Sequence, residues 1–309
     1  MPISASPHDP VLTVTQYYLQ QLINGLMLGS LYALVAIGFS MIYGIVRLIN
    51  FAHGDVVMIG AFATLALIAA GTPWLLVAPV VLLTGVLAGI TIERAVFRPI
   101  RGAPQVTGFI ATLAVSVMIG NAGVMLLSPQ PRNFLFPDLM RTRVPIGPAT
   151  VALTDLVIIA TTLILAGILV LIVRRTRLGM AMRATAENLA VARLMGIDVN
   201  RAIMAAFALG SALAAIAGLL WGGRFGQIDP LMGFAPGLKA FVACVIGGVG
   251  SIPGAMLGGY LLGLGEVLFV GLLPAEYSGY RDAFVFGALI VVLLVLPNGL
   301  LGRSEEERA

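Results

Sequence analysis

Four ionisable side chains stand inside or beside long apolar stretches of the sequence: His53, Asp55, Asp155 and Glu266. A charged group is costly in a lipid bilayer, so each should face other protein groups or water. Carboxylates and imidazoles placed in this way can carry protons or bind cations, which is the chemistry of an ion-coupled carrier. A lone histidine such as His53 is more often a hydrogen-bonded packing residue, and most acidic residues lie near the ends of the apolar stretches. Ion coupling is therefore one functional class to test.

Residues 49–55, with the sequence INFAHGD, separate two apolar runs. The apolar runs are interrupted by Gly44, Asn50, His53, Gly54 and Asp55. Irregular backbone is tolerated at membrane depth only where protein or a water-filled cavity satisfies its polar groups. One interpretation is a broken region beside a translocation path. The other is an ordinary turn, with Asp55 near a helix start where the helix dipole favours it.

Residues 183–201, with the sequence RATAENLAVARLMGIDVNR, are the most densely charged stretch of the chain. The pattern predicts a short helix over residues 185–195, followed by a turn in which Gly196 adopts a left-handed conformation. Asp198 or Asn200 can cap the next helix. A helix of three turns is marginal alone in water, so it needs a surface on which to dock. The alternatives are a solvated connector and a coupling helix that sits in a cleft of a cytoplasmic partner.

Glycines recur every four residues near the C-terminus: Gly250, Gly254 and Gly258 form one series, and Gly259 and Gly263 form another. Such spacing places small residues on one helix face and allows close approach of a second helix. The helix packing can be intramolecular or can form a seam between two chains, and the intramolecular alternative is the simpler one.

The composition identifies the environment of these motifs. The 309 residues are 59% hydrophobic and only 10% charged, and the mean hydropathy is +1.03. Soluble proteins need a more polar surface, so the sequence predicts an all-α, polytopic transmembrane helical bundle formed by one domain over residues 1–309. About nine spans are expected, with eight or ten possible, and the seventh is short. The predicted spans are 18–44, 56–70, 74–92, 106–127, 151–173, 202–222, 238–249, 254–273 and 283–296.

The arginines predict the orientation. Twelve stand in one set of alternate loops: Arg47, Arg94, Arg98, Arg101, Arg174, Arg175, Arg177, Arg183, Arg193, Arg201, Arg303 and Arg308. The other loops hold five: Arg132, Arg141, Arg143, Arg224 and Arg281. The positive-inside rule places the twelve in the cytoplasm, with the N-terminus outside and the C-terminus inside. The basic character thus reflects topology, and no nucleic-acid partner is predicted. Residues 174–201 become the main cytoplasmic loop.

Enzyme chemistry has no support in the sequence. Lys239, the only lysine, stands in GLKA, whereas a phosphate-binding loop requires Gly-Lys followed by Ser or Thr. The motifs HExxH, GxSxG and CxxC do not occur, and the single Cys244 cannot form a multi-cysteine metal site. We therefore expect neither an ATP cofactor nor a metal in this chain.

Residues 186–198, AENLAVARLMGID, resemble the cytoplasmic signature of permeases of ATP-binding-cassette (ABC) importers, with Glu187, Asn188 and Gly196 at the signature positions. Residues 24–62 resemble the LivH-type branched-chain amino-acid permease family, and so do residues 245–259 and 296–302. The resemblance extends over nearly the whole chain, and residues 24–62 are its most specific part.

The resemblance implies a bacterial inner-membrane importer subunit with a fold similar to the vitamin B12-importer class. It implies coupling to an ATPase through residues 183–196, including Arg183, Glu187, Asn188, Ala190 and Gly196, and it favours a path beside residues 44–55. The implied partners are a second homologous permease, two cytoplasmic ATPases that use ATP and Mg²⁺, a periplasmic binding protein and membrane lipid. Branched-chain amino acids are the first substrate expectation. Urea, short amides, aromatic acids and an ion-coupled carrier remain alternatives.

Overall fold

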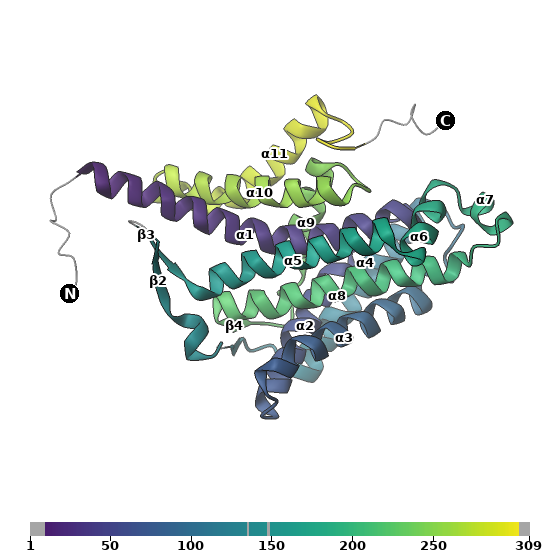
Figure 1. Cartoon of the computed structure of the whole chain (residues 1–309), viewed down its shortest axis with the longest axis horizontal. Coiled ribbons are helices and arrows are strands. Elements are labelled where there is room, and N and C mark those ends of the chain that lie inside the picture. Colours follow the sequence, from purple (N-terminus) through teal and green to yellow (C-terminus); the bar gives the residue numbers. More distant parts are fainter. Residues whose placement is uncertain (1–9, 135, 147–148, 303–309) are drawn as a thin grey trace.

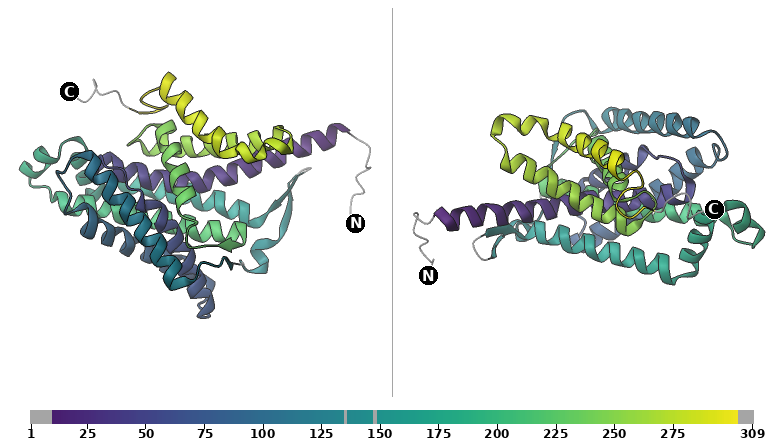
Figure 2. Two further views of the ribbon diagram at one scale, coloured as in Figure 1. Left: turned by 180° about the vertical axis from the view of Figure 1, so that it is seen from behind. Right: turned by 90° about the horizontal axis from the view of Figure 1, so that it is seen from above.

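The structure is a computed structural model that describes residues 10–134, 136–146 and 149–302. The described residues fold mostly into helices, which confirms the predicted fold class (Figure 1, Figure 2). Arg303 and Arg308, two of the arginines that support the predicted orientation, lie outside the described residues.

Eight membrane spans, identified by length and composition, occur among the described residues. They involve α1 (Pro10–Val46), α2 (Ala52–Ala69), α3 (Trp74–Ile92), α4 (Gln105–Leu127), α5 (Leu153–Arg175), α8 (Val199–Phe225), α10 (Ile252–Leu272) and α11 (Arg281–Val295). The last span, Glu276–Val295, begins before α11 and has 20 residues. Helix α9 (Phe234–Gly247) corresponds to the short seventh segment, and its 14 residues are too few to cross a bilayer alone. Each of the nine predicted segments therefore overlaps one helix.

The shorter elements lie between these helices. They are the π-helical η1 (Glu93–Phe97), the 3₁₀ helices η2 (Asp138–Arg141) and η3 (Ala275–Tyr280), the helices α6 (Arg177–Glu187) and α7 (Leu189–Leu194), and the strands β1 (Arg132–Asn133), β2 (Arg143–Ile146), β3 (Ala149–Ala152) and β4 (Gln227–Ile228). Strand β2 pairs antiparallel with β3, and β1 pairs antiparallel with β4. These strands lie at the end of the molecule opposite α7 (Figure 1).

The contacts of α1 with α10 show how the chain crosses the molecule. A Cβ added at Gly29 would lie 2.8 Å from the Tyr260 Cα, and one at Gly44 would lie 3.2 Å from the Gly250 Cα. The two helices are therefore antiparallel, and α10 begins where α1 ends. The Leu300 amide donates to the carbonyl of Ile246, near the end of α9, at 2.9 Å. Since α9 ends beside the start of α10, the described chain begins and finishes at opposite ends of the molecule.

Helices α1 and α8 form the centre of the bundle. The most apolar 18-residue windows of these two helices are 94% and 78% buried, whereas that of α4 is 22% buried and that of the last span is 6% buried. Small residues make the close central packing possible: Gly218 of α8 lies against Val57 of α2, and Gly60 of α2 lies against Ala215 of α8. Peripheral helices α3, α4, α5 and α11 leave apolar side chains exposed, as lipid-facing helices do.

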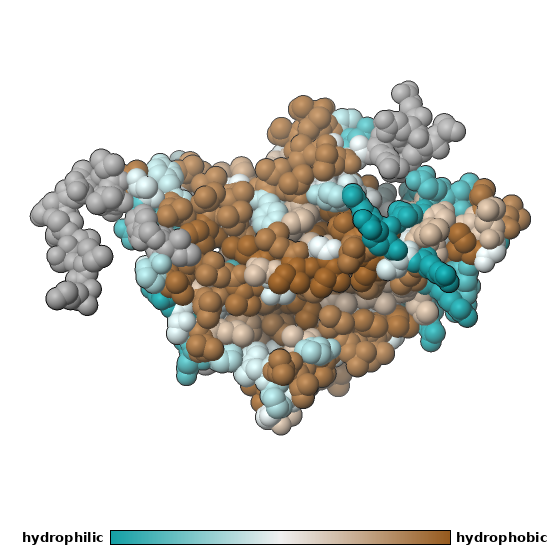
Figure 3. Space-filling model, in the orientation of Figure 1, coloured by the Kyte–Doolittle hydropathy of each residue, from teal (hydrophilic) through white to brown (hydrophobic). Residues whose placement is uncertain are grey.

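The surface hydropathy follows this arrangement. Figure 3 shows a broad hydrophobic surface over the long helices, with hydrophilic residues gathered mainly toward the two ends. Helices α6 and α7 project from one of those ends (Figure 1). The fold thus has an apolar, membrane-compatible body between two polar ends of the molecule. One of these ends carries the charged stretch of residues 183–201.

Candidate functional site

The charged stretch forms two helices rather than the single predicted helix over residues 185–195. Helix α6 ends at Glu187, and the backbone at Asn188 is extended, with φ −154° and ψ 112°. The Asn188 Oδ1 then accepts hydrogen bonds from the amides of Ala190 and Val191, at 2.9 and 3.0 Å, and so caps α7. The prediction was wrong here because asparagine satisfies the first free amides of a new helix better than it continues an existing one.

Gly196 has the left-handed conformation that its position predicted. Its φ is +79°, and the Ile197 amide donates to the Ala192 carbonyl at 3.0 Å, which closes the end of α7. A Cβ at Gly196 would meet no atom within 4 Å, so the requirement for glycine is conformational. Asp198 then caps α8 by accepting from the Arg201 amide at 3.1 Å. Helix α8 starts at Val199, three residues before the predicted start of its span.

Helix α7 and the residue that follows it expose apolar side chains at the protein surface. Leu194 is 87% exposed and Met195 is 76% exposed, whereas Ala192 is 3% exposed and faces the protein. The Arg183 side chain donates to the Val173 carbonyl and ties α6 to the end of α5. Large apolar side chains at the tip of a polar segment are a feature of surfaces that bind a partner. We name residues 189–195 the coupling knob, after the role that the sequence predicts for this stretch.

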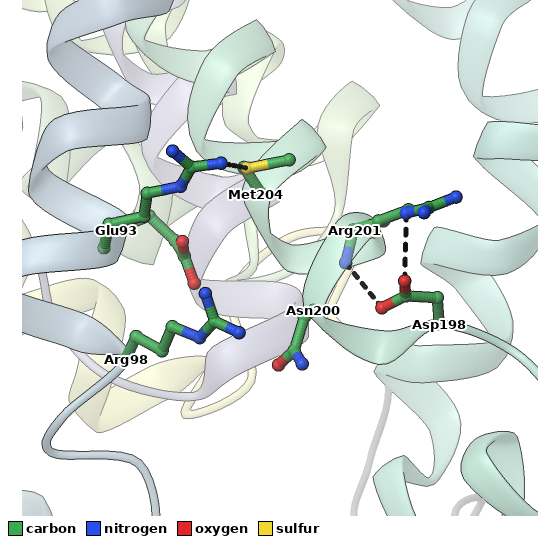
Figure 4. A pocket seen from close by; sticks show the side chains of 7 residues that line it. Glu93, Arg98, Asp198, Asn200, Arg201 and Met204 are labelled. Carbon is green, nitrogen blue, oxygen red and sulfur yellow. Dashed lines mark hydrogen bonds and ion pairs between the residues drawn. The ribbon is translucent and has the colours of Figure 1, made fainter.

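A cavity of about 210 Å³ lies next to the start of α8, near the coupling knob. Its lining residues are Glu93, Arg94, Arg98, Asp198, Asn200, Arg201 and Met204 (Figure 4). The Arg101 guanidinium pairs with Glu93 of η1 and also donates to Asn200 of α8. Burial lowers the pKa of Arg101, and its neighbour Glu93 opposes that shift. Arg101 therefore links the end of α3 to the helix that follows the coupling knob.

The INFAHGD segment is buried, although Asp55 does lie in the first turn of α2. Asn50 is 2% exposed, His53 is 0% exposed and Asp55 is 5% exposed. The structure thus combines features of both interpretations: a helix start, as the turn interpretation requires, but one placed inside the protein. A solvated turn would leave these polar groups in water.

Three helices surround this segment. The Thr112 hydroxyl of α4 donates to the Ile49 carbonyl at 2.9 Å, and the His53 Nε2 lies 3.3 Å from the Val35 carbonyl of α1. A Cβ at Gly54 would lie 2.5 Å from the Gly233 carbonyl oxygen before α9, so only glycine fits there. Gly44 lies farther along, at the contact with Gly250, so the structure does not bring it together with His53 and Asp55.

Several polar atoms of the segment have no hydrogen-bond partner among the described residues. They are both side-chain polar atoms of Asn50, the Nδ1 of His53 and the Oδ2 of Asp55. Buried polar atoms of this kind are costly unless water or a ligand satisfies them. A place on the translocation path stays a prediction for this segment, and neither it nor Gly44 lines the cavity beside the start of α8.

The glycine series face two different helices of the same chain. Gly254 and Gly258 lie against Gly247 and Ala243 of α9, and Gly259 and Gly263 lie against Ala33 and Gly29 of α1. Gly250, at φ +85°, precedes α10 and faces Gly44. Both faces are thus occupied within the chain, as the intramolecular alternative expects.

The opposite end of the molecule holds a network of ion pairs. Lys239 Nζ lies 2.8 Å from Glu266 Oε1 and 2.8 Å from Asp282 Oδ1, and Arg281 Nε lies 2.9 Å from the same Glu266 oxygen. Tyr32 donates to Glu266 Oε2 at 2.9 Å. Glu266 is only 1% exposed, so its charge is compensated by fixed cations, in agreement with the expectation that it faces protein.

A second cavity, of about 430 Å³, opens beside this network. Arg224 of α8 lines the cavity, and its Nε lies 2.6 Å from Asp155 Oδ1 of α5. The acidic residues that the sequence suggested for ion coupling therefore differ in their surroundings. Glu266 and Asp155 are held in ion pairs, whereas Asp55 lies beside the Ser116 hydroxyl.

Comparison with known proteins decides the family. The family described as "Branched-chain amino acid transport system / permease component" matches residues 21–294. The LivH permease of Escherichia coli K12 is 42% identical over 306 residues, which cover 94% of this chain and 98% of LivH. The chain belongs to this family. BraD of Pseudomonas aeruginosa is 41% identical over 307 residues, with 94% and 98% coverage, and a ribose import permease of Haemophilus influenzae is 26% identical over 295 residues, with 94% and 88% coverage.

Family membership confirms the resemblance carried by residues 24–62, and it agrees with the absence of enzyme motifs, because the relatives are transport permeases. No solved structure matches the permease significantly. The expected similarity to the vitamin B12-importer class therefore stays a prediction.

Sequence reasoning missed the ion-pair network of the permease. It identified Lys239 as the only lysine and Glu266 as an expensive carboxylate, but it did not pair them. The two residues are 27 positions apart and lie on different helices. The available signal was compositional: a lone lysine in an apolar helix needs an anion, and few acidic residues occur in apolar segments.

Proposed function

We propose that this chain is the membrane-spanning subunit of an ATP-driven importer that carries branched-chain amino acids across the bacterial inner membrane. The observation that carries this proposal is the 42% identity to LivH over nearly the full length of both chains. The 26% identity to a ribose permease is much lower, so the amino-acid relatives are the better guide to the substrate. Transport proceeds by alternating access, and specificity resides mainly in a separate binding protein.

The proposed assembly follows from the two ends of the molecule. Two ABC ATPases, which use ATP and Mg²⁺, dock at the end that carries the coupling knob, and a periplasmic binding protein delivers substrate at the opposite end. A second, homologous permease completes the membrane channel. The arginine distribution supports a cytoplasmic coupling knob, an outside N-terminus and a cytoplasmic C-terminus. The exposure of Leu194 and Met195 supports docking, because burial of these side chains would stabilise a complex.

The alternative of ion-coupled transport has weaker support. An ion-coupled carrier needs a carboxylate that can release its counter-ion during the cycle. Glu266 is held by two cations and Tyr32, and Asp155 is held by Arg224. Of the three acids that the sequence suggested for ion coupling, only Asp55 has no ion pair among the described residues. Urea and short amides lack a branched apolar side chain, and neither LivH nor BraD is described as their permease.

A transport assay with the complete assembly tests the proposal. The four membrane and cytoplasmic subunits are purified together and reconstituted into liposomes, and radiolabelled leucine is offered with the binding protein. We expect uptake only by transporters whose coupling knob faces the inside of the liposomes, and only when the liposomes contain ATP. Uptake should persist when a protonophore removes any proton gradient. ATP-independent uptake, or uptake abolished by the protonophore, would favour the ion-coupled alternative, and uptake of urea but not leucine would reject the substrate.

A further inference from the structure

The 430 Å³ cavity combines apolar and charged walls in a way that selects a particular ligand chemistry. It lies at the end opposite α7, where α1, the end of α8, the start of α9 and α10 meet. Met27, Leu28, Trp221, Phe225 and Val267 form much of its apolar wall. Cavities of this size, mostly apolar with a few polar groups, are typical of small-ligand sites.

The charged wall contains both signs. Arg224, Lys239, Glu266 and Arg281 line the cavity. Two acids outside the lining pair with these residues: Asp155 pairs with Arg224, and Asp282 pairs with Lys239. The cluster therefore has three basic residues (Arg224, Lys239, Arg281) and three acidic residues (Asp155, Glu266, Asp282), and its formal charge is zero.

This balance disfavours a ligand with net charge. A lone carboxylate that attracted Lys239 and Arg281 would leave Glu266, which is 1% exposed, without its counter-ions. A lone cation bound to Glu266 would leave Lys239, which is 6% exposed, with less compensation. An uncompensated buried charge is strongly destabilising. A ligand that carries both charges can replace both halves of an existing ion pair at once.

We infer that this cavity is a transit site for a zwitterionic α-amino acid with an apolar side chain. The ligand carboxylate accepts hydrogen bonds from Lys239 and Arg281, the ligand ammonium donates to Glu266, and the side chain packs against Trp221 and Phe225. This inference deepens the proposed function and rests on it, because it places the substrate of that importer on named residues of this chain.

The same geometry makes the site weak, as transit requires. Each ion pair formed with the ligand replaces an existing one, such as Lys239–Glu266 at 2.8 Å, so the cost of breaking that pair lowers the net affinity. The preference for an apolar amino acid then comes from burial of its side chain against the aromatic wall, where Trp221 and Phe225 have ring centroids 5.0 Å apart. A weak site can receive the substrate from a binding protein and release it again.

A purely structural role is the competing explanation, since the ion pairs also fasten α9, α10 and α11 together. Ligand selectivity separates the two roles. We would measure binding of radiolabelled leucine to the purified transporter complex without its binding protein, and competition by 4-methylpentanoate, which lacks the amine, and by isopentylamine, which lacks the carboxylate. If the ion pairs only hold the three helices together, leucine has no reason to bind the complex, and binding has no reason to discriminate against either analogue.

Three variants and a control complete the test. Glu266→Gln removes the acceptor for the ligand ammonium, and Trp221→Ala removes apolar wall without breaking an ion pair. Lys239→Met/Glu266→Gln removes one charge of each sign, in case the single variant fails to assemble. Arg143→Gln, on the exposed strand β2, is the control. We expect leucine affinity to fall about tenfold or more in the first three, the usual effect of losing one charge-assisted hydrogen bond or a large apolar contact, and to be unchanged in the control.

The outcomes separate this inference from the proposed function. Saturable leucine binding that both analogues fail to displace, and that the cavity variants weaken, supports the site. If the wild-type complex takes up leucine with ATP and binding protein but shows no such binding, or if Glu266→Gln and Trp221→Ala assemble and bind leucine normally, the inference is overturned while the function stands. If the wild-type complex takes up no leucine, the proposed function is rejected, and this inference, which rests on it, is rejected as well.

Discussion

The turn at Gly196 offers a direct test of how the coupling knob acts. Its φ of +79° is unfavourable for residues with a Cβ, and no atom lies within 4 Å of the position where that Cβ would be. Substitution by valine therefore adds backbone strain without a steric clash. The strain is about 1–2 kcal/mol for an ordinary L residue and is larger for a β-branched one. The turn can relieve it only by changing its backbone angles, and that change re-aims α7.

A change of about 1.4 kcal/mol alters an equilibrium tenfold, so Gly196→Val should shift the equilibrium between the correctly aimed and the re-aimed α7 about tenfold toward the re-aimed form. Helix α8 should be preserved, since Asp198 caps it independently of residue 196. We expect normal membrane insertion, less ATPase retained per permease during purification, and fewer leucine molecules transported per ATP hydrolysed.

Two matched variants isolate the cause. Gly196→Asn should be close to wild type, because asparagine tolerates the left-handed region. Gly71→Val places the same residue at φ +73°, also with no atom within 4 Å, in the turn between α2 and α3. It should produce similar local strain but leave ATPase coupling intact. Equal coupling ratios in wild type and Gly196→Val would refute the reasoning and leave residues 183–201 as a solvated connector.

Three further predictions address other parts of the permease. Burial of Leu194 in the ATPase predicts that Leu194→Asp weakens ATPase binding by about 2 kcal/mol, roughly thirtyfold. Leu194→Met should leave binding unchanged, and pull-down of the ATPase measures both variants. Asp55→Asn should lower uptake about tenfold in an intact complex if Asp55 contacts water or substrate in the path, whereas loss of assembly with normal transport per complex would indicate a structural turn. In a Cys244→Ala background, a cysteine at Gly279 should react with an impermeant reagent in intact cells, and one at Leu194 only after permeabilisation; the reverse pattern would invert the topology.

The long helices were predictable from the sequence because a bilayer imposes a simple rule: every span must be apolar over about 20 residues. The short segment at residues 238–249 was also predictable, and it corresponds to α9. Boundaries were less certain where polar residues are buried in protein. Helix α2 begins at Ala52 and not at Val56, because the interior of the chain accommodates His53 and Asp55.

The candidate site was predictable only where its chemistry is local. The conformation of Gly196 and the cap at Asp198 depend on neighbours in sequence, and both were expected. The cap at Asn188 is local too, but the helical periodicity on both sides concealed it. The pairing of Lys239 with Glu266 depends on how α9 and α10 pack, and local sequence does not encode that packing.

Helix α1 connects the features that the proposed cycle needs. Midway along α1, Gly29 packs against Gly263 of α10. Within the next two turns, Tyr32 contacts Glu266 in the ion-pair network and Val35 meets His53 of the INFAHGD segment. The contacts with α10 are close because glycine removes the side chains, and such backbone contacts resist sliding. We therefore expect α1 and α10 to move as one body, so that displacement at the α7 end reaches the cavity through rotation of this pair. Bending within α1 would instead break the buried backbone contacts that its glycines make with α10.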